Sequence, residues 1–277
     1  MKRALVVIAA LASLVAAQPA GAAAGVRYGI QDDAWLLYGP GTLDSRLATL
    51  DGLGVDLVRF TIDWNRVEPR RGERDWGDAD RVLAGLRGHG LRALVTLYGT
   101  PRWANGGRSP NWAPTSGSAF GSFAAAAAKR YPWVKDWLIW NEPNQRRWLR
   151  PTIALTYVTK LLNPAYAAIH RASGGTRVGG GATAPRGSYG GVSPVQWIRG
   201  MRAAHARLDA YAHHPYPIDR FQTPWTGACG HCETITMASL ERLQREVGRA
   251  WGNGKRIWLT EFGYQTSPPD RMLGVPP

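Results

Sequence analysis

Short β-rich runs alternate with helical stretches along almost the whole chain. The β-rich runs cover residues 26–31, 56–62, 92–98, 134–140, 177–182, 208–214 and 256–261, and helices are predicted at 43–53, 78–89, 118–131, 151–172, 194–206 and 234–250. Parallel strands need a crossover between them and helices supply it, so this alternation predicts a parallel sheet. Seven such units, spaced by roughly 35 residues, favour a TIM (β/α)8-type α/β barrel over an open doubly wound sheet.

The barrel pattern stops after the seventh strand. Only 16 residues follow Glu261, and Pro268, Pro269, Pro276 and Pro277 are among them. Proline disrupts helices and buried strands, so we expect these residues to supply neither a crossover helix nor an eighth strand. The prediction is a barrel truncated before its eighth strand, with a gap between the first strand and the seventh. On this view the chain is a fragment of a longer enzyme.

The N-terminus has the order of a secretory signal. Met1, Lys2 and Arg3 precede an apolar stretch over 4–17 and small residues up to Ala24. The apolar stretch is too short to span a bilayer, and no other segment is long and apolar enough to do so. We therefore predict a signal peptide at 1–24, a barrel domain at 25–277, and a secreted protein, extracellular or periplasmic.

The chain is strongly basic, with a formal net charge of +14. Its 29 arginines and 5 lysines are scattered, and no basic helix or aromatic-interleaved arm forms a nucleic-acid footprint. The excess fits solvated surface arginines, with weak attraction to anionic cell-wall polymers as a secondary possibility. No glycine-rich phosphate loop follows the first strand, and "GGG" at 179–181 lies inside a predicted strand, where close packing is the better explanation. No cofactor is expected.

Two cysteines, Cys229 and Cys232, lie in the turn-rich stretch "TPWTGACGHCETIT". In an exported protein this pattern favours a structural disulfide that closes a small loop. A redox-active pair resembling that of disulfide isomerases is disfavoured, because that motif follows a strand and opens a helix. A zinc site with His231 is weaker still, because structural zinc needs four ligands, so no metal is expected.

Polar side chains gather where the predicted strands end. In a parallel barrel, catalytic groups project from the C-terminal ends of the strands. The fourth strand ends with Asn141 and Glu142, the sixth with His213, His214 and Tyr216, the seventh with Glu261, and the second carries Arg59. The two glutamates are therefore expected at the same mouth.

A pair of carboxyl groups with different pKa values is what glycosidic cleavage requires. Glu142 and Glu261 each follow a run of large apolar residues, which should desolvate them and raise their pKa, whereas Arg59 would lower the pKa of whichever it approaches. For either glutamate taken alone, a surface salt bridge or a helix cap is the favoured interpretation. Two at matching ends, with histidine, tyrosine, asparagine and arginine converging, indicate a site.

The motif "WNEPN", followed about 120 residues later by "LTEFGY", resembles the acid/base and nucleophile signatures of glycoside hydrolase clan A, closest to families 39 and 5 (β-xylosidase- and cellulase-like). "VRFTIDWNRVEP", "TPRWA" and "HHPYP" extend the resemblance over strands two to seven. The resemblance implies that Glu142 is the general acid/base and Glu261 the nucleophile. It further implies that the supporting residues are Asn141, which donates to the sugar 2-hydroxyl, Arg59 and Tyr216, which hold the nucleophile, and His214, on the acid/base side.

Other residues at the mouth are aromatic. Tryptophans expected in mouth loops are Trp103, Trp112, Trp148 and Trp225, and we favour sugar stacking over packing for Trp103 and Trp148. Trp137 and Trp258 fall inside strands and are expected in the core. The family usually takes an aromatic sugar platform from the eighth strand, which this chain is expected to lack.

The sequence thus favours a retaining glycosidase that acts on a polysaccharide or its oligomers. The first rival is a non-catalytic carbohydrate-binding barrel, which could lose a carboxylate, although both are present. The second is an exported thiol oxidoreductase built on Cys229 and Cys232. A metal hydrolase using His213 and His214 is disfavoured, because adjacent strand residues face opposite sides of a sheet.

Overall fold

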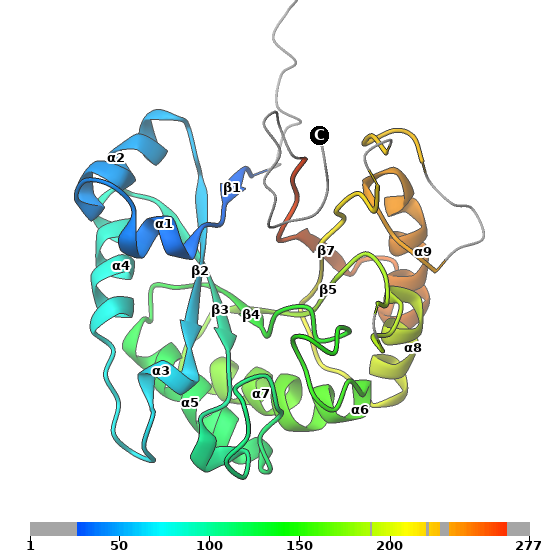
Figure 1. Ribbon diagram of the computed structural model, residues 1–277, viewed down its shortest axis with the longest axis horizontal. Helices are drawn as coiled ribbons and strands as arrows, with labels where there is room; N and C mark the ends of the chain where they lie inside the picture. The colour runs from blue at the N-terminus through cyan, green and yellow to red at the C-terminus, as the bar shows by residue number, and fades with distance from the viewer. Residues whose placement is uncertain (1–26, 189, 220–221, 228–232, 265–277) are drawn as a thin grey trace, which may run out of the picture.

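The computed structural model describes residues 27–188, 190–219, 222–227 and 233–264. Within them, seven parallel strands pair in chain order to form one sheet. They are β1 (Gly29–Ile30), β2 (Leu57–Asp63), β3 (Arg92–Tyr98), β4 (Asp136–Ile139), β5 (Arg177–Thr183), β6 (Ala210–His213) and β7 (Arg256–Leu259). Figure 1 shows the sheet curled, with the helices around its outside. This is a TIM-type barrel of seven described strands, as predicted.

The helices cover the outer face of the curled sheet. They are α1 (Asp33–Tyr38), α2 (Leu43–Gly52), α3 (Trp64–Val67), α4 (Gly77–Gly88), α5 (Gly117–Arg130), α6 (Ala154–Tyr157), α7 (Asn163–Ala172), α8 (Pro194–Ala203) and α9 (Leu240–Trp251). Single turns of other helix types lie at Arg102–Ala104, Val158–Leu162 and Met237–Ser239. The predicted helix at 151–172 is therefore composite: a π turn joins α6 to α7. The short α1 and α3 were not predicted, because four to six residues carry too little periodicity to be seen.

Three of the predicted strands, the first, the fourth and the seventh, end earlier than expected. The first spans only Gly29–Ile30, and beyond it the Thr61 backbone N–H donates to the Asp33 side chain at 3.1 Å rather than to a continuing strand. The fourth ends at Ile139 rather than Trp140, because Trp140 adopts a left-handed backbone with φ of 72°. The seventh likewise ends at Leu259, before Glu261. The early ends of β4 and β7 leave Trp140 and Glu261 in loops at the C-terminal edge of the sheet.

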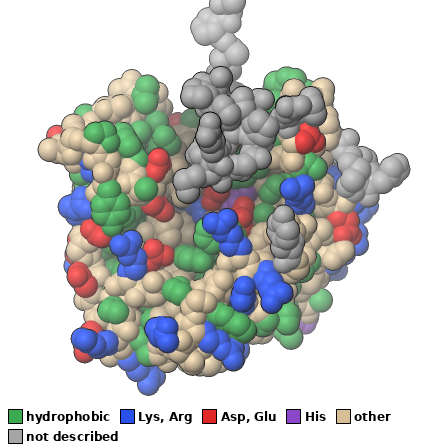
Figure 2. Space-filling view, in the orientation of Figure 1, with side chains coloured by type: hydrophobic (Ala, Val, Ile, Leu, Met, Phe, Trp, Pro, Cys, Tyr) green, Lys and Arg blue, Asp and Glu red, His purple; other side chains and the backbone are tan. Residues whose placement is uncertain are grey.

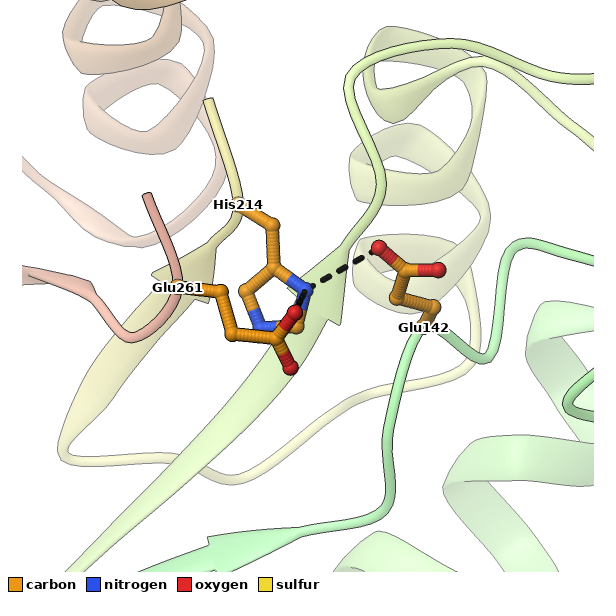
Figure 3. Close-up of side chains that lie close together, drawn as sticks. All are labelled: Glu142, His214 and Glu261. Carbon is orange, nitrogen blue, oxygen red and sulfur yellow. Dashed lines mark hydrogen bonds and ion pairs between the residues drawn. The ribbon is translucent and has the colours of Figure 1, made fainter. Parts of the chain in front are cut away.

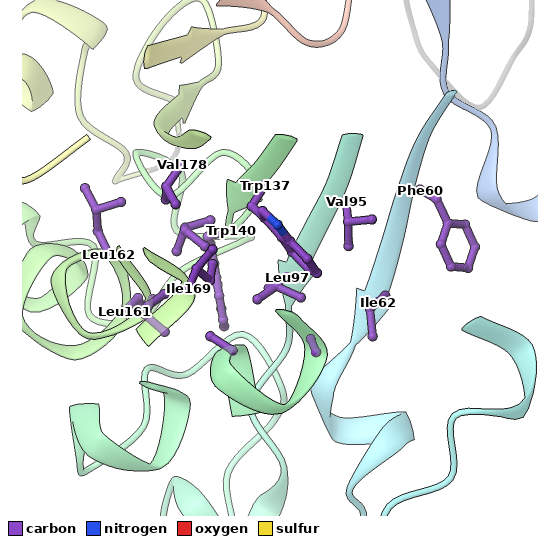
Figure 4. Packing of buried hydrophobic residues seen from close by; sticks show 14 of the residues in the cluster. Phe60, Ile62, Val95, Leu97, Trp137, Trp140, Leu161, Leu162, Ile169 and Val178 are labelled. Carbon is purple, nitrogen blue, oxygen red and sulfur yellow. The ribbon is translucent and has the colours of Figure 1, made fainter. Parts of the chain in front are cut away.

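The sheet separates two apolar clusters. The large outer cluster lies between strands and helices and contains Val95, Leu97, Trp137 and Ile169 (Figure 4). A small inner cluster inside the curl is formed by Leu94, Leu138, Ala182 and Ala212, with Leu57 and Trp258 packed against it. Alternate strand residues face opposite sides, so Arg59, Thr96 and His214 share the inner side with this cluster. The core placement predicted for Trp137 is confirmed, and Trp258 is partly buried against the inner cluster.

The glycine run in β5 serves close packing, as predicted. A Cβ atom on Gly179 would lie 2.7 Å from the Trp258 ring, and one on Gly180 would lie 2.8 Å from Leu162. Gly181 has a φ of 94°, and its Cβ would lie 2.6 Å from the Tyr211 ring. These contacts leave no room for a side chain on either face of the strand.

The two edges of the sheet agree with the gap expected between the first strand and the seventh. Among the described residues, β1 pairs only with β2 and β7 only with β6, so the two end strands flank the open side in Figure 1. In the same part of the chain, none of the helices has the length and apolar character needed to cross a membrane. The predicted signal peptide and both cysteines, Cys229 and Cys232, lie outside the described residues.

Candidate active site

The predicted site residues meet at the C-terminal edge of the sheet. Glu142 stands in the loop after β4, His214 directly follows β6, and Glu261 stands two residues after β7. His214 lies between the two glutamates (Figure 3). Its Nδ1 is 3.1 Å from Glu142 Oε1 and 3.6 Å from Glu261 Oε2. One carboxylate oxygen of each glutamate lies within 4.8 Å of the other. The tertiary fold therefore brings together two carboxylates that the sequence separates widely.

Arg59 organises the Glu261 side of this cluster. Its guanidinium is 3% exposed and projects from β2 into the curl. Nη1 donates to Glu261 Oε1 at 2.6 Å and Nη2 donates to Asn141 Oδ1 at 2.9 Å, while Nε donates to Thr96 Oγ1 at 2.9 Å. The planar guanidinium thus orients the Glu261 and Asn141 side chains, and its hydrogen bond to Thr96 anchors it on β3. Because Asn141 accepts through Oδ1, its Nδ2 remains as a donor.

Glu261 is surrounded by groups that stabilise its ionised form. Burial raises the pKa of this carboxyl, but His214, Arg59 and the Tyr216 hydroxyl together outweigh burial and lower the pKa below its ordinary value. Tyr216 donates to Glu261 Oε2 at 3.3 Å. Burial and the neighbouring Glu261 charge raise the pKa of Tyr216, so it stays a hydroxyl donor. Desolvation alone suggested a raised pKa for both glutamates. Arg59 was expected to lower the pKa of whichever glutamate it approached, and for Glu261 this expectation is confirmed: Arg59 and Tyr216 donate to the carboxylate, and His214 Nδ1 lies 3.6 Å from it.

An unusual turn aims Glu142 into the cleft. Trp140 and Glu142 both have left-handed backbones, with φ of 72° and 37°. Such conformations cost non-glycine residues about 1–3 kcal/mol each and persist only where the surroundings impose them. Here Trp140 Nε1 donates to the Trp148 carbonyl at 2.8 Å, and the Glu142 carbonyl accepts from Gln145 N at 2.8 Å. Hydrogen bonds of Trp140 and of Glu142 itself therefore hold the strained turn in place.

Sequence reasoning missed two residues that support this turn. Asn144 is fully buried, and its side chain accepts from Ala184 N at 2.9 Å and donates to the Val192 carbonyl at 2.9 Å. Gln145, 8% exposed, donates to the Arg186 carbonyl. Together they join the loop after β4 to the loop after β5. Their position directly after "NEP" was the available signal, but their partners lie about 40 residues away in sequence.

The tryptophans predicted at the mouth have different surroundings. Trp103 packs edge-on against Trp64 at 5.5 Å and donates through Nε1 to the Glu68 carbonyl at 2.9 Å, so its contacts are those of a packing residue. Trp148 instead lines a cavity that includes Glu142. Trp112 lies under the Arg108 guanidinium at 4.2 Å, and Trp225 is 85% exposed.

His213 is separated from the cleft. It is fully buried, with Nδ1 2.8 Å from Thr183 Oγ1 and Nε2 3.0 Å from the Ile235 carbonyl. Burial lowers its pKa to about 3, so it is neutral. It therefore serves packing, as the alternation of strand residues predicted.

Glu142, His214 and Glu261 also form a group that could offer ligand atoms to a metal ion. Their surroundings oppose this use. Arg59 places a positive charge 2.6 Å from Glu261, and the second nitrogen of His214 is 3.0 Å from Thr260 Oγ1. A cation would have to displace or tolerate the guanidinium, so the donor set fits carboxylate chemistry better than metal binding.

Comparison with known proteins gives a fold likeness only. Neither a scan against models of protein families nor a search of curated proteins gave a match. Among solved structures, the chain is similar to a family 39 glycoside hydrolase from Bacteroides cellulosilyticus, with a TM-score of 0.68 and 18% identity over 89% of this chain and 50% of the other. It is also similar to a monomeric β-xylosidase from Caulobacter crescentus, with a TM-score of 0.62 and 17% identity over 88% of this chain and 53% of the other.

An endo-β-1,4-glucanase from Xanthomonas axonopodis gives a TM-score of 0.60 and 16% identity over 88% of this chain and 81% of that one. The chain thus has the barrel fold found in family 39 and related glycoside hydrolases. It spans about half the length of the first two proteins.

Proposed function

We propose that this protein is a retaining glycoside hydrolase that cleaves O-glycosidic bonds of a poly- or oligosaccharide. The observation that carries the proposal is the approach of the Glu142 and Glu261 carboxylates to within 4.8 Å, oxygen to oxygen. Retaining enzymes place their two carboxyl groups ~5 Å apart, whereas inverting enzymes need ~6.5–9.5 Å to admit a water molecule between carboxyl and sugar.

The contacts of each glutamate suggest its role. Glu261, ionised by its donors, attacks the anomeric carbon and forms a glycosyl–enzyme ester as the glycosidic C–O bond breaks. Glu142 gives its proton to the departing oxygen. It then takes a proton from the water that hydrolyses the ester, which regenerates both glutamates. Asn141, with Nδ2 free to donate, is placed to bind the sugar 2-hydroxyl, and Tyr216 and Arg59 keep Glu261 oriented.

The proposal also covers the location of the enzyme and its need for a cofactor. The N-terminal sequence supports export, so we infer that the enzyme meets its carbohydrate substrate outside the cytoplasm. No cofactor enters the mechanism, because both steps need only the two carboxyl groups and water.

The test is a comparison of two glutamate variants on aryl glycosides. Glu261→Gln should reduce turnover of every substrate by on the order of 10⁴-fold or more. Glu142→Ala should lose about 10²–10⁴-fold on glycosides with poor leaving groups but far less on 2,4-dinitrophenyl glycosides, which need no protonation. Glu241→Gln, which changes a glutamate that is 93% exposed on α9, is the matched control and should keep full activity.

Two results would count against the assignment. Equal losses in Glu142→Ala on activated and unactivated substrates would remove the acid/base role. Oligosaccharide binding without turnover of any aryl glycoside would favour a non-catalytic carbohydrate-binding barrel instead.

A further inference from the structure

A cavity of about 360 Å³ opens beside Glu142. It lies between the loops that follow β4, β5 and β6, and its lining includes Arg147, Trp148, Arg186 and Pro217. The volume falls within the range of sites that hold small ligands, about 300–1,000 Å³. The cavity lining includes Glu142 but not Glu261.

This position assigns the cavity to one side of the reaction. In the proposed mechanism Glu142 protonates the departing oxygen, and Glu261 contacts the anomeric carbon. A sugar ring that reaches Glu142 but not Glu261 is therefore the leaving group. The following inference rests on that proposed function.

The two arginines give this side of the cleft a positive charge. Arg147 comes from the loop after β4 and Arg186 from the loop after β5, and neither guanidinium forms an ion pair with a carboxylate in the described part of the chain. The carboxylate that shares the cavity, Glu142, is already 3.1 Å from His214. Figure 2 shows basic side chains gathered near the middle of this face, beside a hollow in which carboxylate and histidine atoms are visible.

The loops that carry the arginines are held in place. Buried Gln145 donates to the Arg186 carbonyl, and its Oε1 accepts from Ser188 N at 3.3 Å and Ser188 Oγ at 3.2 Å. The Arg147 guanidinium lies over one face of the Trp148 ring, 5.5 Å from its centre, and a contact with a ring face leaves the N–H groups in the guanidinium plane for a ligand. A ring that can cover a sugar face thus stands beside two planar donors that match the geometry of an anionic group.

We propose that the leaving-group side of the cleft binds a sugar that carries an anionic substituent, with Arg147 and Arg186 as its charge partners and Trp148 as its stacking surface. The anionic group is the carboxylate of a uronic acid or a sulfate ester. Both present oxygen atoms to which a guanidinium can donate two parallel hydrogen bonds.

Equilibrium binding tests this inference without depending on turnover. Methyl β-glucuronide, glucose 6-sulfate and the neutral methyl β-glucoside are titrated against the whole chain, by calorimetry or ligand-observed NMR. We expect at least one anionic sugar to bind ten times more tightly than the neutral one, and to lose this preference in 0.5 M NaCl. The two anionic probes distinguish a carboxylate from a sulfate as the preferred group.

Two variants locate the site. In the double variant Arg147→Gln, Arg186→Gln, the anionic and neutral sugars should bind with about equal affinity. Arg146→Gln removes the same charge from the same loop, but Arg146 is not part of the cavity lining, so this variant should keep the preference. All three arginines are exposed, and the variants are expected to fold.

The possible outcomes separate the two proposals. Equal affinity of the wild-type protein for anionic and neutral sugars, or an equal loss in Arg146→Gln, would overturn the inference. Turnover of aryl glycosides without anionic preference would overturn it while leaving the proposed glycosidase intact. Anion binding that depends on Arg147 and Arg186, without any turnover, would support the anionic site and remove the hydrolase assignment.

Discussion

Arg59 Nη1 lies 2.6 Å from Glu261 Oε1, across a separation of 202 residues in sequence. Both side chains are largely buried, at 3% and 17% exposure. The same guanidinium also holds Asn141 and is anchored on Thr96. One arginine of β2 therefore links β3 and the segments after β4 and β7 at the point where the proposed nucleophile must stay ionised.

Arg59→Lys should lower kcat/KM by about 10²–10³-fold, because one ammonium cannot replace three directed donors. Arg59→Met should in addition lower the free energy of unfolding by about 3–5 kcal/mol, because it leaves the Glu261 carboxylate buried without its partner. Arg81→Lys is the control: Arg81 is 44% exposed and pairs with Asp78 on the surface of α4. Unchanged kinetics in Arg59→Lys would contradict this prediction.

The lowered pKa of Glu261 predicts a pH-dependent contribution to stability. Because the folded-state pKa is depressed, the contribution is complete above the unfolded-state pKa of about 4.3 and is lost as pH falls through the folded value. Glu261→Gln removes the titrating group. The Tm difference between wild type and Glu261→Gln should be constant above about pH 5.5 and shrink at lower pH. A difference that grows on acidification would mean that the pKa is raised instead.

Tyr216→Phe should move the acid limb of the kcat/KM profile to higher pH. The Tyr216 hydroxyl is one of the groups that lower the Glu261 pKa, so its removal raises that pKa. The loss of a hydrogen bond to a charged group, about 1.5–3 kcal/mol, also predicts a decrease in kcat/KM of roughly 10–100-fold. Tyr28→Phe, at a residue that is 54% exposed, should leave the profile unchanged. A profile that does not move in Tyr216→Phe would argue against this contact in solution.

Trp103 and Trp148 should respond differently to truncation. Trp103→Ala removes an edge-on contact with Trp64 and a hydrogen bond to the Glu68 carbonyl, so we expect a loss of about 1–3 kcal/mol in stability with little change in KM for aryl glycosides. Trp148→Ala should raise KM for oligosaccharides that occupy the leaving-group side. Thermal unfolding and kinetics on short and long substrates measure both effects. A raised KM in Trp103→Ala would restore the stacking role predicted from sequence.

Gly179→Ala should destabilise the protein by about 1–3 kcal/mol, because the added Cβ would lie 2.7 Å from the Trp258 ring inside the curl. Gly88→Ala, at the end of α4, meets no atom within 4 Å and should be neutral or stabilising by up to about 1 kcal/mol. Chemical denaturation of both variants tests the contrast. Equal stability would show that the inner cluster can shift to admit a methyl group.

The sequence by itself determined the fold type and which two glutamates would meet at the C-terminal edge of the sheet. Helix and strand periodicity are local properties, and in a parallel sheet all strands end at one edge, so residues at strand ends are brought together whatever the side-chain details. Glu142, Glu261, Arg59, His214 and Tyr216 could therefore be placed at one mouth from pattern alone.

Only the tertiary structure decided how those residues act on one another. The sequence indicated that burial raises a glutamate pKa and that Arg59 lowers it, but the net lowering for Glu261 depends on the positions of Arg59, His214 and Tyr216, which come from β2 and from the segment after β6. Trp103 packs against Trp64 whereas Trp148 lines the cavity beside Glu142, and this difference depends on which residues pack against each loop. The contacts of Asn144 and Gln145 with the loop after β5 lie about 40 residues away. Such contacts are set by packing between elements, which no local pattern in the chain records.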